Sequence, residues 1–293
     1  MNGEQQSGAG SNERISPTAL LTAYGRTLTD IPFSRDIFEE SEKIRLSKGE
    51  AAMPVEFQTP ATAPRFEARH KLINRLLRQS GVTQVLEIAA GLSPRGLEMT
   101  ADPDFTYAEV DLTGNAQLKQ KIVDAITAKP TVGVRTNLSV EEGDALDLVS
   151  LQAATTCLDR AKPIAIITEG LLRYLNPDEK TTVAKNIQTL LKQFGGVWIT
   201  SDTTAKRNSQ NENAAVQAQS EKTKQTTGIN TDLNLFKDSK ETQDFFQHLG
   251  FTVEDHQLME AAKELISPKK LGQTDKEVET LLSDKHVYVM KLE

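Results

Sequence analysis

The sequence contains no long hydrophobic run, which excludes a membrane-spanning helix. No window approaches the roughly 18 consecutive apolar residues that a helix needs to cross a bilayer. The opening residues, MNGEQQSGAGSNE, also lack the apolar segment of a signal peptide. From the sequence we therefore expect a cytoplasmic protein without a membrane partner.

Cysteine is almost absent as well. The single cysteine, Cys157, permits neither an internal disulfide nor a cysteine-based zinc site. Its place beside Leu158 favours a buried structural thiol over a nucleophile. The histidines are far apart and show no metal-ligand spacing, so we expect no metal site. They are His70, His248, His256 and His286.

Positive charge is in deficit. Asp and Glu number 41 against 34 Lys and Arg, which gives a formal net charge of −7 and no sustained basic patch. Because proteins bind nucleic-acid phosphates with Lys and Arg, this composition argues against a nucleic acid as the main partner. The length of 293 residues fits one elaborated α/β domain.

The sequence does contain an alternation of strand-like and helix-like segments. Consecutive strand–helix units predict an α/β fold, with a mostly parallel sheet and helices on both of its faces. The last two strand candidates lack a long periodic helix between them, so we expect them to form an antiparallel pair. The candidates are Gln84–Ala89, Phe105–Asp111, Thr136–Glu142, Pro163–Glu169, Val197–Asp202, Phe251–Gln257 and His286–Leu292.

Composition also divides the chain into parts. Residues 1–13 are polar and rich in small side chains, and we expect them to be disordered. Residues 14–64 carry helical patterns that end in a loop over 49–64, and we interpret them as an N-terminal helical cap. The main domain is then 65–293, and within it the almost wholly polar segment 203–228 predicts a lid or insertion.

Two helices in the main domain are informative. Pro177–Phe194 has Asn176 as its N-cap and Glu179 in position for a capping box. In the helix between Pro64 and Gly81, Arg69 falls within the apolar stripe. Since a buried guanidinium needs an anion, Arg69 pairs with an internal acid, reaches solvent by its tip, or meets an anionic ligand.

The stretch Gln84–Leu97, QVLEIAAGLSPRGL, has the form of a strand that runs into a turn of small residues. At such a turn, small side chains let a bound nucleotide approach the backbone. A dinucleotide fingerprint would have glycine at three positions, which here are Ala89, Gly91 and Pro94. With one glycine of three, an NAD-type oxidoreductase is the weaker interpretation.

Carboxylates stand at or near the ends of four successive strands, and parallel strands bring these ends to one edge of the sheet. They are Glu87, Asp111, Asp144 and Glu169. Asp111 comes twenty residues after Gly91, the spacing at which an acid meets ribose hydroxyls. Glu169 would suit an ammonium group and Arg69 a carboxylate, so the set fits a ligand that joins adenosine to a cationic amino acid.

With these residues the chain resembles the leucine carboxyl methyltransferase-like family of class I O-methyltransferases, which includes enzymes of polyketide and other small-molecule synthesis. The resemblance covers nearly everything after the polar start. It rests on Arg69 and on the motifs QVLEIAAGLSPRG, YAEVDL, EEGDAL and ITEGLLRYL. It implies a Rossmann-like class I methyltransferase sheet of seven mostly parallel strands, with S-adenosyl-L-methionine as the methyl donor.

Residue by residue, the resemblance implies a donor site. Arg69 would bind the donor's carboxylate, Asp111 the ribose and Glu169 the amino group, with Asp144 and Ala145 at the adenine. The complete set is Arg69, Glu87, Ala89, Ala90, Gly91, Asp111, Leu112, Asp144, Ala145, Leu146, Glu169 and Gly170.

The cofactor loop departs from the family pattern, which usually reads close to L-G-A-G-L-D-T-R. Here Ala89 replaces the first glycine, and Ser93 and Pro94 replace the Asp-Thr pair. An alanine fits that position if its backbone keeps an ordinary conformation.

The sequence defines the residues that bind the methyl acceptor less clearly. In methyl transfer from a sulfonium, the protein mainly aligns the acceptor atom with the methyl group. Tyr174 is the best candidate to position a substrate, with Arg173 beside it, and Tyr24 and Arg26 are further candidates. We expect an enzyme that methylates a hydroxyl or carboxyl oxygen of a small molecule. A non-catalytic donor-binding protein and an interaction module without cofactor are the alternatives, and the sequence leaves the acceptor, a general base and the oligomeric state open.

Overall fold

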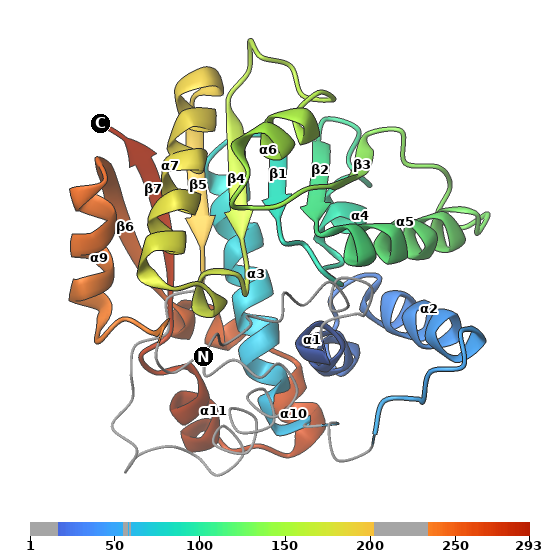
Figure 1. Ribbon diagram of the computed structural model, residues 1–293. Coiled ribbons are helices and arrows are strands. Elements are labelled where there is room, and N and C mark those ends of the chain that lie inside the picture. Colours follow the sequence, from blue (N-terminus) through green and yellow to red (C-terminus); the bar gives the residue numbers. More distant parts are fainter. Residues whose placement is uncertain (1–16, 55–57, 59, 202–233) are drawn as a thin grey trace, which may run out of the picture.

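A seven-stranded sheet with helices on both of its faces forms the centre of the molecule (Figure 1). This confirms the predicted α/β architecture. The computed structural model describes residues 17–54, 58, 60–201 and 234–293. The predicted disordered start and the predicted lid, 1–13 and 203–228, lie outside the described residues.

All the expected strands are present, with ends that differ from the prediction by at most two residues. They are β1 (Gln84–Ile88), β2 (Thr106–Asp111), β3 (Leu138–Glu142), β4 (Ile164–Thr168), β5 (Gly196–Thr200), β6 (Phe251–Gln257) and β7 (His286–Leu292). Their order in the sheet is β3-β2-β1-β4-β5-β7-β6. β1 to β5 pair in parallel, whereas β7 is antiparallel to both β5 and β6, so the expected terminal antiparallel pair is confirmed.

Helices connect these strands, and η marks a 3₁₀ helix. They are α1 (Pro17–Thr27), α2 (Ser34–Ser47), η2 (Pro60–Thr62), α3 (Ala63–Gln79), α4 (Arg95–Met99), α5 (Thr113–Thr127), α6 (Leu148–Ala154), η3 (Leu172–Tyr174), α7 (Pro177–Phe194), α9 (Ser239–His248), η6 (Leu258–Glu264), α10 (Ser267–Leu271) and α11 (Asp275–Leu282). In this described part, no helix is both long enough and apolar enough to span a bilayer.

Helix α7 has the predicted bounds because both of its ends are encoded locally. The Asn176 side chain accepts hydrogen bonds from the backbone N–H groups of Asp178 and Glu179, both at 3.0 Å. The Glu179 side chain accepts from the Asn176 N–H in return and completes the capping box. At the other end, Gly195 follows the helix with a φ of 73°.

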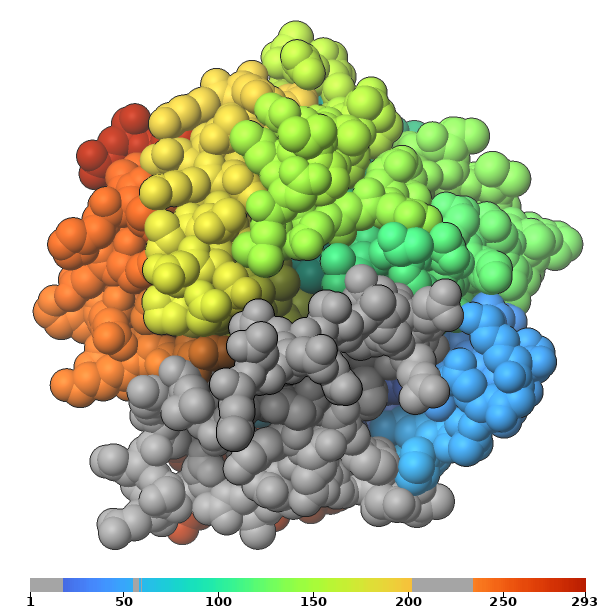
Figure 2. All heavy atoms as spheres, viewed as in Figure 1, coloured from blue at the N-terminus to red at the C-terminus, as the bar shows by residue number. Residues whose placement is uncertain are grey.

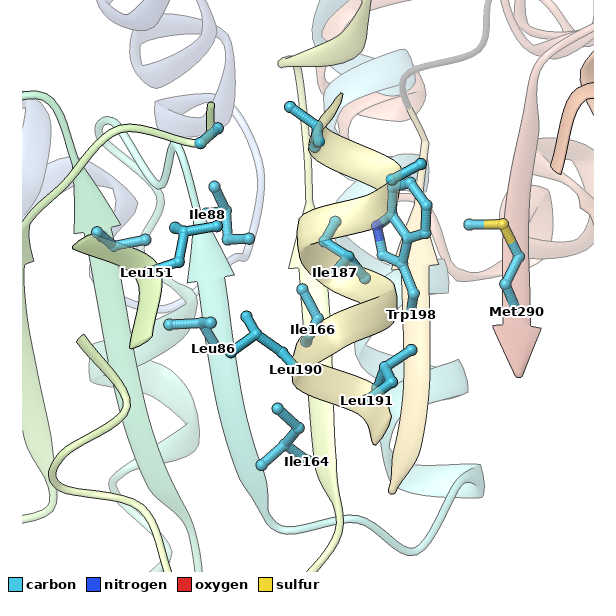
Figure 3. Packing of buried hydrophobic residues seen from close by; sticks show 14 of the residues in the cluster. Leu86, Ile88, Leu151, Ile164, Ile166, Ile187, Leu190, Leu191, Trp198 and Met290 are labelled. Carbon is cyan, nitrogen blue, oxygen red and sulfur yellow. The ribbon is translucent and has the colours of Figure 1, made fainter. Parts of the chain in front are cut away.

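One face of the sheet packs against α6, α7 and α9. Trp198 of β5 lies at the centre of this layer, with its ring centroid 5.0 Å from that of Phe246 on α9. Leu190 and Leu191 of α7 complete the contact with the sheet, and Figure 3 shows Leu190 near Leu86 and Ile166. In the space-filling view these helices form a continuous yellow-green to orange surface over the strands (Figure 2).

The opposite face packs against α3, η6 and α11. Leu72, Ile73 and Leu77 of α3 are fully buried there against β1, β4 and β5. The N-terminal helices α1 and α2 form a separate apolar cluster with α4 and α5. They therefore lie at the end of the sheet where β1 and β4 terminate (Figure 1).

Two local predictions were wrong. The predicted loop over 49–64 ends earlier, because η2 begins at Pro60 and Pro64 lies in the first turn of α3, where a missing N–H costs little. Cys157 is exposed instead of buried. Its neighbour Leu158 takes the inward position, and the Cys157 sulfur lies 3.3 Å from the Ser139 hydroxyl.

Candidate functional site

A cavity of about 210 Å³ lies at the carboxyl ends of β1, β2 and β4, where α1 and α3 close it. This is the edge at which ligands bind in open α/β sheets. Most of the predicted donor-site residues line it: Arg69, Glu87, Ala89, Ala90, Gly91, Asp111, Glu169 and Gly170.

The turn after β1 is held by its neighbours. The backbone N–H of Gly91 donates to Asp111 Oδ2 at 2.7 Å, and the Lys119 ammonium donates to the Ser93 carbonyl at 2.6 Å. Lys119 also forms a buried ion pair with Glu109 at 2.8 Å. Side chains from β2 and α5 therefore fix a turn that contains few hydrogen-bonding groups of its own.

Ala89 does not keep an ordinary backbone conformation. Its φ is 57°, in the left-handed region that glycine adopts more easily, and Gly91 has a φ of 50°. A single alanine in this region costs on the order of 1 kcal/mol. The condition under which alanine would fit this position without strain is therefore not met.

Asp111 is a buried carboxylate that can accept a further hydrogen bond. Besides the Gly91 N–H, its carboxylate accepts from the Leu112 N–H at 2.8 Å and from the Asn115 amide at 2.9 Å. Burial raises the pKa of Asp111, and these hydrogen bonds oppose the rise. A carboxylate has about four lone-pair sites, so a ligand hydroxyl can still bind there.

Glu169 is surrounded by three arginines. Arg26 and Arg95 each place a terminal nitrogen 2.5 Å from its carboxylate, and Arg69 Nε lies at 2.8 Å. Burial would raise the pKa of Glu169, but the charges of Arg69, Arg26 and Arg95 outweigh it and hold that pKa well below its usual value. Glu169 is therefore ionised. Of the possible partners expected for Arg69 from the sequence, the structure shows an internal acid, Glu169.

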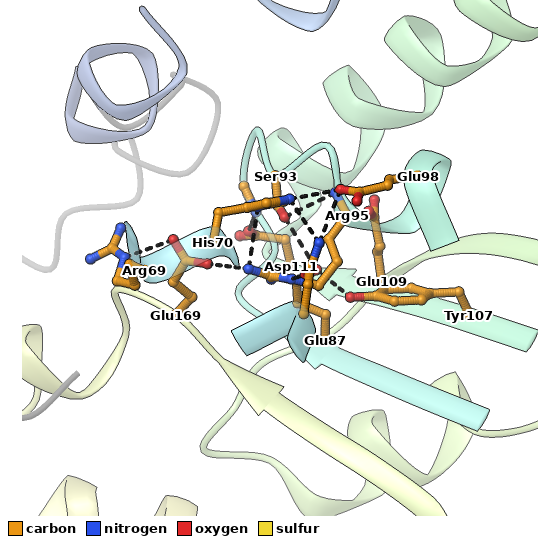
Figure 4. A network of polar contacts seen from close by, with 12 residues as sticks. Arg69, His70, Glu87, Ser93, Arg95, Glu98, Tyr107, Glu109, Asp111 and Glu169 are labelled. Atoms are coloured by element: carbon orange, nitrogen blue, oxygen red, sulfur yellow. Dashed lines mark hydrogen bonds and ion pairs between the residues drawn. The ribbon is translucent and has the colours of Figure 1, made fainter. Parts of the chain in front are cut away.

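Arg95 is the most enclosed member of this group. Its side chain is 0% exposed and forms a second ion pair with Glu87, while Nε donates to Asn74 Oδ1 at 2.8 Å (Figure 4). Although burial lowers the pKa of Arg95, Glu87 and Glu169 raise it further. Arg95 is thus a fixed cation behind the cavity.

Glu87 is the second acidic partner of Arg95. It lies within β1 and also accepts from the Tyr107 hydroxyl at 2.7 Å and from the Ser93 hydroxyl at 3.3 Å. Because it is paired with the fully buried Arg95, Glu87 holds that guanidinium in place behind the cavity.

Glu169 is shared by more cations than one carboxylate can neutralise. Three guanidinium groups, from Arg26, Arg69 and Arg95, converge on the single carboxylate of Glu169, and Glu87 pairs with Arg95 alone. Arg69 has the most accessible of the three side chains, with 15% exposed, and it lines the cavity. The site can therefore bind an anionic group beside Arg69.

Four predicted cofactor residues lie outside the cavity lining. Asp144 is exposed, and its Oδ1 accepts from the Leu146 N–H at 2.9 Å. Ala145 is 9% exposed and Leu112 is 43% exposed. They follow β3 and β2, whose last residues Asp111 and Glu142 pair, and so form the adjoining rim of the same edge.

The residues predicted to contact the methyl acceptor do not all line the cavity. Tyr174, Arg173 and Arg26 line the cavity, and the Arg173 guanidinium lies 5.9 Å from the Tyr174 ring centroid. Tyr24 is not among the lining residues. Its ring packs edge-on against Phe38 at 5.6 Å, and Arg26, two residues along α1, lies on the opposite side of the helix and faces the cavity.

Sequence reasoning missed the importance of Arg95 and His70. The available signal was Glu87, an acid in the middle of an otherwise apolar strand, which requires a buried cation nearby. His70 is 1% exposed and bonds to Glu98, so it belongs to a polar network. Within the described residues, no group of three or more His, Cys, Asp or Glu side chains could hold a metal ion.

The family described as leucine carboxyl methyltransferase matches residues 21–188. A Streptomyces coelicolor protein named "Putative S-adenosyl-L-methionine-dependent methyltransferase" is 29% identical over 196 residues, which cover 60% of this chain and 62% of that protein. A Mycobacterium tuberculosis protein of the same description is 31% identical over 114 residues, or 38% of this chain and 35% of its own length. The chain thus spans less than two thirds of the length of these relatives.

Solved structures share the fold. A Thermobifida fusca protein described as a "putative methyltransferase" superposes with a TM-score of 0.57 at 14% identity, over 98% of both chains. A DUF574 family protein from Streptomyces avermitilis gives 0.55 at 14% identity, over 94% of this chain and 97% of its own. The class I methyltransferase sheet predicted from the sequence is confirmed, and the relatives carry the cofactor name that the sequence predicts.

Proposed function

Because the chain belongs to the leucine carboxyl methyltransferase family, we propose that it is an S-adenosyl-L-methionine-dependent methyltransferase. Its substrate is a small molecule, and the methyl group goes to a hydroxyl or carboxyl oxygen. The observation that carries this proposal is the convergence of three arginines on Glu169, at the edge where the Ala89–Gly91 turn and Asp111 also meet.

The residues of the cavity fit the amino-acid end of the donor. Arg69, the most accessible of the three arginines, binds its carboxylate. Glu169 lies beside Arg69 and offers a carboxylate to the donor's ammonium group. The small side chains of Ala89, Ala90 and Gly170 leave room for the methionine chain against the backbone.

The nucleoside end extends past the cavity. The cavity has a volume of about 210 Å³, below the roughly 300–1,000 Å³ of ordinary ligand pockets. It therefore encloses only part of the donor. Asp111 then binds the ribose. The exposed Leu112, with Asp144, Ala145 and Leu146 on the neighbouring strand end, supplies the surface for the adenine.

When bound, the donor supplies a methyl group on a sulfonium that is already an activated leaving group. The chain aligns the acceptor oxygen with that methyl group and excludes water. Tyr174 is placed to orient the acceptor, and Arg26 closes the cavity from α1. The N-terminal helical cap, residues 14–64, thereby contributes to the acceptor side. A carboxylate acceptor needs no general base.

Isothermal titration with S-adenosyl-L-methionine and with its demethylated product tests the proposal. We expect binding of both, and no binding at high micromolar concentration would refute it. A second candidate, donor binding without turnover, is favoured by the strained Ala89 in the cofactor turn. Binding without methyl transfer to a broad panel of hydroxyl and carboxyl acceptors would support that candidate.

A further inference from the structure

A polar chain runs from the cavity through the interior to a second cleft. Arg95, which pairs with Glu169, places Nη2 3.5 Å from His70 Nδ1. On the other side of the imidazole, His70 Nε2 lies 2.7 Å from Glu98 Oε2 (Figure 4). The order Glu169–Arg95–His70–Glu98 therefore links two separate surfaces.

The second surface does not touch the donor cavity. It is a cleft of about 690 Å³ along the outer side of α3, and Glu98, with 20% of its side chain exposed, lines it together with Asn74 and Arg78. His70, one residue after Arg69 on α3, lies at the inner wall of this cleft with 1% of its surface exposed. The solvent-facing end of the chain is thus Glu98.

The contacts define which nitrogen of His70 carries the proton. An ionised carboxylate only accepts hydrogen bonds, so Nε2 must donate to Glu98, and Nδ1 is then free to accept from Arg95. Arg95 is fully buried, and three of its other N–H groups go to Asn74, Glu87 and Glu169. His70 supplies a fourth acceptor for the five N–H groups of this buried guanidinium.

The charges around His70 favour this neutral form. Burial lowers the pKa of His70, the bond to Glu98 opposes this, and the nearby charges of Arg95 and Arg26 lower it further. Asn74, the other polar neighbour, carries no charge; its Nδ2 lies 3.1 Å from Nε2 and donates, like Nε2, to Glu98 Oε2. A second proton on His70 would remove the acceptor and bring another cation against Arg95.

We propose that His70 is a positioning residue for donor binding, whose neutral Nδ1 holds Arg95 against Glu169 so that Arg69 remains available to the ligand. This rests on the donor site proposed above. The second cleft, through Glu98, is then where solvent conditions act on that site.

Two substitutions at position 70 separate positioning from packing. In His70→Asn the amide oxygen takes the place of Nδ1 and keeps the acceptor, whereas in His70→Gln the amide reaches the place of Nε2 and leaves Arg95 one partner short. By titration at neutral pH, we expect donor affinity within about threefold of wild type for Asn and about tenfold weaker for Gln. The exposed His248→Gln is the matched control and should bind as wild type. Equal losses in Asn and Gln would overturn the proposal.

The pH profile gives a readout that packing would not move. Donor affinity should fall once the pH is low enough to protonate His70. Glu98→Gln removes the carboxylate that favours the protonated form of His70. In this variant the fall in donor affinity should therefore occur at lower pH than in wild type. The same pH dependence of donor affinity in Glu98→Gln and wild type would contradict the proposal. If wild type binds no donor, the proposed function fails and this role with it. Nitrogen NMR of the ligand-free protein still decides the tautomer, since a protonated Nδ1 would refute the contact with Arg95.

Discussion

Arg26 and Glu169 lie 143 positions apart in the chain, and Arg26 Nη2 is 2.5 Å from Glu169 Oε1. This ion pair is almost fully buried and ties α1 to the end of β4. The carboxylate that anchors α1 is therefore the same one that holds Arg69 and Arg95. One acid therefore contributes both to the docking of α1, beside the apolar cluster, and to the electrostatics of the cavity.

Removal of this acid should be more harmful than removal of one of its partners. Glu169→Gln leaves three guanidinium groups without their shared counterion, and we expect the free energy of unfolding to fall by about 3–5 kcal/mol. Arg26→Met removes one of three mutually repelling cations and should cost about 1 kcal/mol or less. Urea unfolding of both variants measures the difference, and equal losses would contradict the role assigned to Glu169.

Donor binding should depend on Arg69 and Asp111. Arg69→Ala removes the accessible cation, and Asp111→Ala removes the ribose acceptor, so each should weaken donor affinity by about 10- to 100-fold. Arg78→Ala is the control, because Arg78 lies on the outer side of the same helix. Circular dichroism checks that each variant is folded. Wild-type affinity in both test variants would refute the placement of the donor.

Ala89→Gly should stabilise the protein. Glycine relieves the left-handed strain at φ 57°, on the order of 1 kcal/mol, and loses part of this gain to the greater freedom of the unfolded chain. We expect a net gain of about 0.5 kcal/mol in urea unfolding. Ala90→Gly, at a residue without a positive φ, should instead destabilise. The same sign for both variants would show that Ala89 is unstrained.

Stability should decline in mild acid because of His70. The folded protein holds the pKa of His70 below its ordinary 6.5, whereas the unfolded chain takes up the proton near that value. Between the two pKa values the unfolded state binds more protons, so the free energy of unfolding falls as the pH falls, by at most about 1.4 kcal/mol per pH unit. Urea midpoints of His70→Asn across this range should be less pH-dependent. Parallel profiles for both proteins would argue against a buried neutral His70.

Cys157 should react as a free surface thiol. Because it is exposed, we expect one thiol to be labelled by a maleimide in the native protein, at a rate within about tenfold of a free cysteine. Cys157→Ser should abolish labelling. Reaction only after denaturant is added would support the buried position expected from the sequence.

Much of the fold could be predicted because its signals are local. Asn176, Glu179 and Gly195 encode both ends of α7 within a few residues, and the alternation of strand and helix defines the sheet. Local signals were insufficient where neighbours decide the outcome. Cys157 and Leu158 are adjacent and apolar, and only the packed sheet determines which of them turns inward.

By itself, the sequence determined the order of the elements, the edge where their carboxylates gather and the family resemblance. The partners of those carboxylates were decided by the tertiary structure. Arg69, Arg95 and Arg26 converge on Glu169 from α3, α4 and α1, over separations of 74 to 143 residues. Sequence spacing cannot predict such pairs, because burial selects whichever charges the packed helices bring within reach of each other.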